Sequence, residues 1–277
     1  MSTRSAGLRR ETIPDAFDAG AFAYDRLVGA NPGYHKHLWL SAQRMRLPGA
    51  GRGLRLLDAG CGTGASTAAL LAAAPYAEIV AVDASGAMLE RARAKRWPPS
   101  VTFVHTPVER LAAAGVHGPF DGILAAYLIR NVADPDAVLR DLRGLLRPGG
   151  TLAVHEYSVA DSAAARAVWQ AVCTAVIIPA GRVLSGDAAL YRYLRRSVAG
   201  FDGAARFRRR LRDAGFTGVH SETVPGLPAG AASCTRSWPA VPPWPAAPCP
   251  AAQRVSAGDR RAARAGPPGG QASRPRR

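Results

Sequence analysis

The sequence lacks any long uncharged apolar run. Its longest candidate, residues 167–178, contains Gln170 and Thr174 and falls short of the ~18–20 apolar residues that a membrane-spanning helix needs. The first residues also lack the apolar stretch that is typical of a secretory signal. We therefore expect neither a membrane span nor export, and the cytoplasm is the expected location.

Cysteine is scarce and follows no functional pattern. The four cysteines are Cys61, Cys173, Cys234 and Cys249, and none forms a C-x-x-C pair or has a histidine at the spacing of metal ligands. This distribution argues against a zinc site and against a disulfide framework. We expect no metal.

Acidic residues are few, with 20 Asp and Glu against 36 Lys and Arg, which gives a net charge of +16. A basic chain can indicate nucleic-acid binding. However, residues 229–277 alone contain eight Arg and one Asp, and the rest of the excess is spread along the chain. We interpret the arginine-rich patches at 192–196 and 206–212 either as solvated helix faces or as surfaces attracted to anionic lipid headgroups. Under the second interpretation the protein contacts a membrane peripherally, and nucleic acid is not an expected partner under either.

A glycine-rich loop is the most informative feature that the sequence does contain. Residues 56–64 read L-L-D-A-G-C-G-T-G, and Asp83 follows a second apolar run at 78–82. Glycines let the backbone approach a ligand closely. An acid at the end of the second strand of a doubly wound sheet commonly bonds ribose hydroxyls. The two features together predict a site for a nucleotide-like ligand.

The loop does not fit a dinucleotide. A pyrophosphate prefers a neutral glycine loop at a helix N-terminus, whereas this loop begins with the carboxylate of Asp58. That carboxylate would repel pyrophosphate and would suit a cationic or amine-bearing ligand.

Apolar runs alternate with helical patterns up to about residue 225. Expected strands are 54–58, 79–83, 101–104, 120–126, 151–156 and 216–223, and expected helices include 65–74, 85–93, 134–146 and 203–214. This alternation predicts an α/β fold with a doubly wound, mostly parallel sheet. We divide the chain into a helical N-terminal cap (1–48), a ligand-binding domain (49–225) with a helical lid at about 161–200, and a tail (226–277).

The tail differs in composition from the rest of the chain, with Ala, Pro, Arg and Gly dominating and no periodic pattern. It is interpreted as a disordered extension or as the product of a shifted reading frame in a GC-rich gene. Under the second interpretation the final antiparallel strand is missing, which would leave an apolar sheet edge exposed.

The D-x-G-x-G-x-G loop resembles the first motif of class I S-adenosylmethionine-dependent methyltransferases. Four further segments narrow the resemblance: Y-L-I-R-N-V-A-D at 127–134, L-L-R-P-G-G at 145–150, H-E-Y-S at 155–158 and L-Y-R-Y-L-R-R-S-V at 190–198. In this order they resemble the ubiquinone/menaquinone biosynthesis C-methyltransferase family over about residues 15–225. The resemblance implies an enzyme that methylates a ring carbon of a prenylated quinone or hydroquinone.

The resemblance also implies a set of cofactor-binding residues. For S-adenosylmethionine these are Asp58, Gly60, Gly62, Thr63, Gly64, Asp83, Met88, Pro107, Val108 and Ala126. Thr63 and the glycines would hold the methionine end, Asp58 would lie near its amine, and Asp83 would bind the ribose. Pro107 stands where the family usually has Asn or Asp. Either neighbours such as Thr106, Val108 and Glu109 hold the adenine, or the affinity is lower.

Methylating a hydroquinone ring carbon requires loss of a phenolic proton, so a base or hydrogen-bond acceptor is expected near the ends of strands 120–126 and 151–156. The candidates are His155, Glu156, Tyr191 and Arg130, with Asn131 orienting the acceptor. Each has a structural alternative. His155 could be a satisfied core histidine, Glu156 could pair with Arg130 or Arg192, and Tyr191 could pack the lid together with Tyr193.

Two other functions remain open from the sequence. One is a methyltransferase of the same fold that acts on a soluble natural-product acceptor. The other is a basic, non-catalytic nucleic-acid-binding protein, for which binding that weakens steeply with salt would be the sign.

Overall fold

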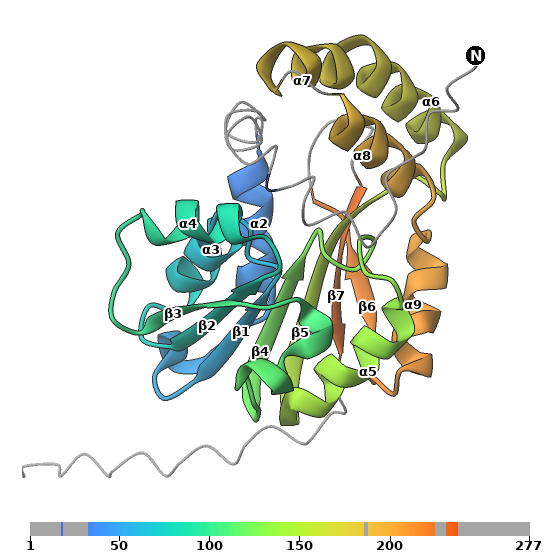
Figure 1. Cartoon of the computed structure of the whole chain (residues 1–277). Coiled ribbons are helices and arrows are strands. Elements are labelled where there is room, and N and C mark those ends of the chain that lie inside the picture. Colours follow the sequence, from blue (N-terminus) through green and yellow to red (C-terminus); the bar gives the residue numbers. More distant parts are fainter. Residues whose placement is uncertain (1–17, 19–32, 186–187, 225–230, 238–277) are drawn as a thin grey trace, which may run out of the picture. The chain divides into compact units, whose positions relative to one another are not determined.

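One sheet forms the centre of the computed structural model (Figure 1). The structure describes residue 18 and residues 33–185, 188–224 and 231–237. The strand order in the sheet is β3-β2-β1-β4-β5-β7-β6. The strands are β1 (Arg55–Ala59), β2 (Glu78–Asp83), β3 (Val101–His105), β4 (Phe120–Ala126), β5 (Leu146–Ser158), β6 (His220–Glu222) and β7 (Ala231–Ser237).

Helices cover both faces of this sheet. They are α2 (Tyr34–Arg44), α3 (Ala65–Ala73), α4 (Gly86–Arg93), α5 (Pro135–Leu145), α6 (Ala163–Val172), α7 (Ile178–Ser185), α8 (Ala189–Ala199) and α9 (Ala204–Asp213). Short turns add η2 (Pro48–Gly51), η3 (Val108–Arg110), η4 (Ala112–Ala114) and the π-helical η5 (Cys173–Ile177). One apolar cluster joins the sheet to α2 and α3, and another joins it to α5 and α9. The α/β, mostly parallel fold is therefore confirmed.

The central strands β1, β2 and β4 form where the sequence has apolar runs. β1 pairs in parallel with β2 and with β4, so that Leu57 lies beside Val80 on one side and Ile123 on the other. Strands buried on both faces favour such continuous apolar runs. The helix expected at 85–93 forms α4, and the Ser85 side chain caps it by accepting from the Met88 backbone N–H at 3.1 Å.

The final antiparallel strand is present, so the prediction that it is missing was wrong. β7 runs antiparallel to β5 from Ser237 opposite Leu152 to Ala231 opposite Ser158, and β6 pairs with its other edge. A strand can add to an open edge through backbone hydrogen bonds alone, without the apolar pattern that sequence analysis looks for. The remainder of the predicted tail, residues 225–230 and 238–277, lies outside the described residues.

The predicted helical insertion after β5 forms α6, η5, α7 and α8, which we call the lid. Figure 1 shows α6 and α7 along one side of the molecule, with α8 between them and the sheet. The continuous helical stretch Ala163–Leu184 is long and apolar enough to cross a membrane by length and composition alone, and it is the one such stretch among the described residues. This apolar stretch is longer than the one expected from the sequence.

Candidate functional site

The topology brings the ends of β1, β2 and β4 together. Because β1 connects to β2 on one side and lies beside β4 on the other, the loops that follow these strands meet at the point where the strand order reverses. A cavity of about 500 Å³ lies there. Its lining comes from the glycine loop (Gly60, Cys61, Gly62, Thr63), the start of α3 (Ala65, Ser66), the end of β2 and the start of α4 (Asp83, Ala84, Ser85, Met88), the segment 107–110, the segment 126–133 except Ile129, and Tyr34.

The glycine loop has the backbone conformation that glycine allows. Gly60, Gly62 and Gly64 all have positive φ, at 75°, 54° and 90°. A Cβ added to Gly60 would lie 3.0 Å from the Leu128 side chain, and one added to Gly64 would lie 2.8 Å from the Trp97 ring. At Gly62 the same atom would meet nothing within 4 Å. The loop therefore packs closely at its two ends and is open towards the cavity in its middle.

Asp83 lines this cavity at the end of β2. It accepts hydrogen bonds from the backbone N–H groups of Gly62 at 2.7 Å and Ser85 at 2.9 Å. Burial raises the pKa of Asp83, and the two N–H donors act in the opposite direction. These bonds fix the carboxylate at the end of β2 and leave it lone pairs with which to accept further hydroxyls.

Asp58 lies behind the loop instead of lining the cavity. Its Oδ2 accepts from the hydroxyls of Ser66 at 2.8 Å and Thr67 at 2.7 Å. Within the described part of the chain its Oδ1 is buried without a hydrogen-bond partner. Burial is the main cause that raises the pKa of Asp58 to about 7. Ser66, which donates to Asp58, lines the cavity and so links this carboxylate to it.

Four further residues that the resemblance assigns to the cofactor lie at this cavity. Met88, Pro107, Val108 and Ala126 all line the cavity. Of the neighbours suggested to replace the missing amide, Val108 and Glu109 also line it. Thr106 does not, and its hydroxyl lies 3.2 Å from the carbonyl oxygen of Pro107.

Arg130 and Glu156 form a buried ion pair. The Arg130 guanidinium donates through Nη1 to Oε2 of Glu156, and the Arg130 backbone N–H donates to Oε1 at 3.2 Å. Burial raises the pKa of Glu156, and the adjacent Arg130 counteracts this. The structural alternative for Glu156, pairing with Arg130, is therefore the one observed. Glu156 lines neither cavity and acts by fixing Arg130.

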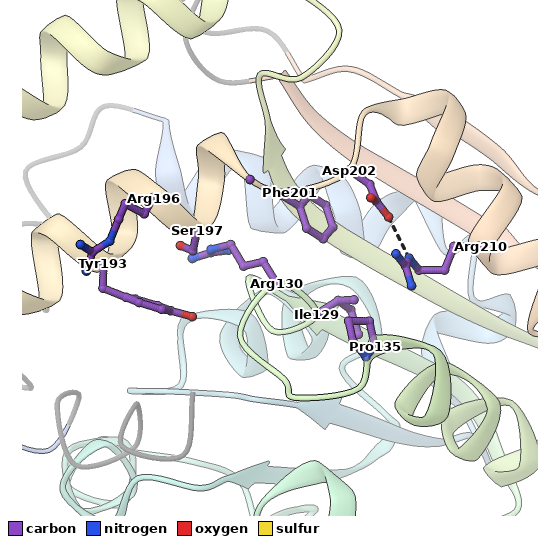
Figure 2. Close-up of a pocket in the computed structure, with 10 residues that line it drawn as sticks. Ile129, Arg130, Pro135, Tyr193, Arg196, Ser197, Phe201, Asp202 and Arg210 are labelled. Atoms are coloured by element: carbon purple, nitrogen blue, oxygen red, sulfur yellow. Dashed lines mark hydrogen bonds and ion pairs between the residues drawn. The ribbon is translucent and has the colours of Figure 1, made fainter. Parts of the chain in front are cut away.

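A second cavity, of about 400 Å³, lies on the other side of Arg130 (Figure 2). Its lining is Ile129, Arg130, Pro135, Tyr193, Arg196, Ser197, Gly200, Phe201, Asp202 and Arg210. Asp202 is paired with Arg210 at 2.8 Å, whereas Arg196 has no side-chain partner among the described residues. Arg130 lines both cavities.

Asn131 joins the lid to the loop after β4. Its Nδ2 donates to the carbonyl oxygen of Tyr127 at 2.8 Å, and its Oδ1 accepts from the Tyr193 hydroxyl at 3.1 Å. Tyr127 itself has a positive φ of 57°, which is uncommon for a bulky residue and is typical of functional sites. The turn at Tyr127 directs the following residues, Arg130 and Asn131, towards the cavities.

His155 is a core histidine with both ring nitrogens engaged. Nδ1 lies 2.8 Å from the Ser41 hydroxyl, and Nε2 lies 2.9 Å from the Tyr127 hydroxyl. The Ser41 hydroxyl donates to the carbonyl oxygen of His37 at 3.0 Å, so it accepts from Nδ1–H, and Nε2 accepts from Tyr127. Burial is the main cause that lowers the pKa of His155 to about 3. The imidazole is therefore neutral and lies away from both cavities.

Tyr191 belongs to the packing of the lid, and three residues that were not predicted line the cavities. Tyr191 is buried against Gly181, where an added Cβ would lie 2.1 Å from its ring, so it packs the lid. Tyr34, Ser66 and Tyr193 are lining residues that the sequence did not reveal. Tyr34 and Tyr193 reach the cavities only through packing of α2 and α8, which no local motif signals. No group of metal-ligating side chains occurs in the described ranges.

The chain matches known proteins over most of its length. Residues 6–236 match the ubiE/COQ5 methyltransferase family. A ubiquinone/menaquinone biosynthesis C-methyltransferase from Bradyrhizobium diazoefficiens is 32% identical over 227 residues, which is 79% of this chain and 89% of that protein. A demethylmenaquinone methyltransferase from Clavibacter sepedonicus is 32% identical over 214 residues, which is 76% of this chain and 85% of that protein.

A solved structure shares the fold. It is the magnesium protoporphyrin IX methyltransferase of Synechocystis PCC 6803 with bound S-adenosylmethionine, which superposes with a TM-score of 0.58 at 16% identity. The superposition covers 85% of this chain and 99% of that one.

Proposed function

This chain belongs to the ubiE/COQ5 methyltransferase family, and we propose that it methylates a ring carbon of a prenylated hydroquinone. Its cofactor is S-adenosylmethionine, as the family implies. Two relatives support this acceptor class by their names, one a ubiquinone/menaquinone biosynthesis C-methyltransferase and the other a demethylmenaquinone methyltransferase. The observation that carries the proposal is that the glycine loop, Asp83 and the Arg130–Asn131 pair line one cavity.

The residues present fit S-adenosylmethionine. The glycine loop leaves open space at Gly62, and the fixed Asp83 carboxylate suits ribose hydroxyls. The buried Oδ1 of Asp58 lacks a partner in the described structure and suits a nearby positive charge. Thr63 and Ser66 would hold the methionine end, while Met88 and Val108 would lie against adenine.

When bound, the cofactor supplies a methyl group that is already activated on a sulfonium. The protein then mainly has to align the acceptor carbon and raise its nucleophilicity. The Arg130 guanidinium, held by Glu156, would stabilise a phenolate oxygen of the acceptor and so favour the deprotonated ring. Asn131, held by Tyr127 and Tyr193, would orient the same ring.

Neither of the two candidate bases on β5, His155 and Glu156, is free to accept a proton from the acceptor. His155 lies away from both cavities with both nitrogens engaged, and Glu156 is bound to Arg130. The proton of the phenol would therefore leave to solvent through the open second cavity, with its loss favoured by the positive charge of Arg130. Ile129 and Phe201 in that cavity offer apolar surface to a ring or prenyl chain.

Calorimetry with two variants tests the cofactor assignment. Asp83→Ala should lose S-adenosylmethionine binding by at least about tenfold, because a charge-assisted hydrogen bond contributes roughly 1.5–3 kcal/mol. Glu90→Ala removes an exposed carboxylate of the neighbouring helix α4 and should bind like the parent. Equal affinities in the two variants would contradict the assigned site.

Transfer of a labelled methyl group tests the acceptor. Demethylated prenyl hydroquinone should be methylated on carbon, and small soluble phenols should react much more slowly. Preference for a soluble aromatic acceptor would favour the natural-product alternative, with the cofactor site unchanged.

A further inference from the structure

The outer face of the lid is apolar and exposed. In α6, η5 and α7, Val168 is 37% exposed, Val176 59%, Val183 84% and Leu184 42%. Across the described residues, the two other large apolar side chains with this exposure are Trp39 and Tyr76. Isolated exposed apolar residues are ordinary, but a cluster on one element marks an interaction surface.

The inner face of the same helical stretch packs against other parts of the chain. Trp169 and Cys173 are buried with Val159 and Val198, and the Trp169 indole N–H donates to the carbonyl oxygen of Arg195 at 3.2 Å. α8 therefore covers one side of the stretch. The valines lie on the side that α8 leaves uncovered.

The charge around this face is positive. Arg166, Arg182, Arg192 and Arg195 belong to the lid, and none of them pairs with a carboxylate in the described structure. Arg166 donates to the Ala160 carbonyl oxygen, and Arg195 donates to the Thr174 hydroxyl at 3.2 Å. Asp161, at the start of the lid, accepts from the Ala204 backbone N–H at 2.6 Å. An apolar face with arginines around it is the pattern of a helix that lies in the headgroup region of a bilayer.

We propose that the face formed by Val168, Val176, Val183 and Leu184, together with Arg182 and Arg192, docks on an anionic lipid bilayer. The valines would enter the headgroup boundary, and the arginines would contact lipid phosphates. The helix lies along the bilayer surface and does not cross it, because Arg166 and Arg182 lie within the apolar stretch and its inner face is packed on α8.

Docking would also serve the reaction, and to that extent the inference rests on the proposed function. α8 packs under α6 and α7, and its residues Tyr193, Arg196 and Ser197 line the second cavity. Figure 2 shows these three side chains on one helix beside Arg130. A lipid-soluble acceptor could thus pass from the bilayer to the cavity over a short path along the lid.

Vesicle sedimentation of the full chain, without cofactor or acceptor, tests the proposal. Vesicles of phosphatidylcholine alone are compared with vesicles that also contain phosphatidylglycerol. The parent should sediment with the anionic vesicles, and its binding should weaken as salt increases. The double variant Val176→Glu/Val183→Glu should bind at least about tenfold more weakly at every salt concentration. Tyr76→Glu, which changes an equally exposed side chain outside the lid, should bind like the parent.

Unchanged binding of the valine variant, or no binding of the parent to anionic vesicles, would overturn the proposal. Resistance of bound parent to alkaline carbonate would also overturn it, because it would mean that the helix spans the bilayer. Melting temperature and S-adenosylmethionine binding show that the variants are folded. Methylation of a water-soluble short-chain hydroquinone is measured separately, so failure of docking and failure of the proposed function give different results.

Discussion

Asp58 and Asp83 are both carboxylates at the carboxyl ends of the neighbouring strands β1 and β2, yet their surroundings differ. Asp83 accepts from backbone N–H groups and faces the cofactor cavity. Asp58 is buried behind the loop with a pKa of about 7. His155 and Glu156 were candidate bases in the sequence, but the structure gives each of them a buried partner. His155 lies beside the Tyr127 hydroxyl, and Glu156 pairs with Arg130.

The pH dependence of stability tests whether His155 is a core residue. Burial lowers the pKa of its imidazole from the ordinary 6.5 to about 3, so the unfolded chain binds a proton more tightly than the folded one. This contribution to stability is complete above pH 6.5 and is lost as the pH falls towards 3, and it amounts to at most about 5 kcal/mol. In His155→Phe, unfolding by denaturant should depend less on pH in this window.

The same variant separates a core role from a catalytic one. With a core role, His155→Phe should lower the free energy of unfolding at pH 8 by about 1–3 kcal/mol, because the Tyr127 and Ser41 hydroxyls lose a partner. The pH profile of kcat should keep its shape. A kcat profile that loses a titration step would instead identify His155 as a base.

At the scale of elements, β7 is the part in which structure and sequence interpretation differ most, whereas the lid formed where an insertion was expected. β7 lies between β5 and β6, so it covers the edge of β5 over seven paired positions and is the strand that holds β6 in the sheet. The lid uses one face to pack α8 and leaves the other exposed.

Two truncations test the contribution of β7. A chain that ends at residue 230 lacks the strand, and a chain that ends at Ala240, where the compact unit Met1–Ala240 ends, retains it. The shorter chain should melt about 5–10 °C lower and should aggregate, because an unpaired edge is exposed. Equal melting temperatures and equal elution on size-exclusion chromatography would show that β7 adds nothing to the fold.

At the scale of the whole molecule, cofactor binding should couple the two halves of the sheet. The cavity takes residues from the ends of β1, β2 and β4, so a ligand that contacts all of them stabilises the folded state as a unit. S-Adenosylmethionine at about 100 times its Kd should add roughly 2.7 kcal/mol to the free energy of unfolding. For a domain of this size that is a rise in Tm of about 5–10 °C.

A pair of glycine variants tests this coupling. Gly60→Ala places a Cβ at positive φ and 3.0 Å from Leu128, so the ligand-induced rise in Tm should shrink. Gly144→Ala, in α5 with nothing within 4 Å of the new Cβ, should keep the full rise and should raise the Tm of the free protein. Equal ligand-induced shifts in both variants would contradict the role of the loop.

The sequence by itself determined the order of elements and most of the predicted residues that line the cavity at the glycine loop. Apolar runs, the glycine loop, Asp83 and the caps of α4 and α5 are local signals, because each depends on residues that are close along the chain. The family assignment followed from ordered motifs of the same local kind and was confirmed by the match over residues 6–236.

Only the tertiary structure decided the acceptor side. The sequence placed His155, Glu156, Arg130 and Tyr191 in one group of candidates. In the structure, the ring nitrogens of His155 lie beside the hydroxyls of Tyr127 and Ser41. Arg130 lines both cavities. Tyr34 and Tyr193 reached the site through helices distant in sequence, and β7 formed because an open edge was available. Such contacts depend on burial and on partners from elsewhere in the chain, which no local pattern encodes.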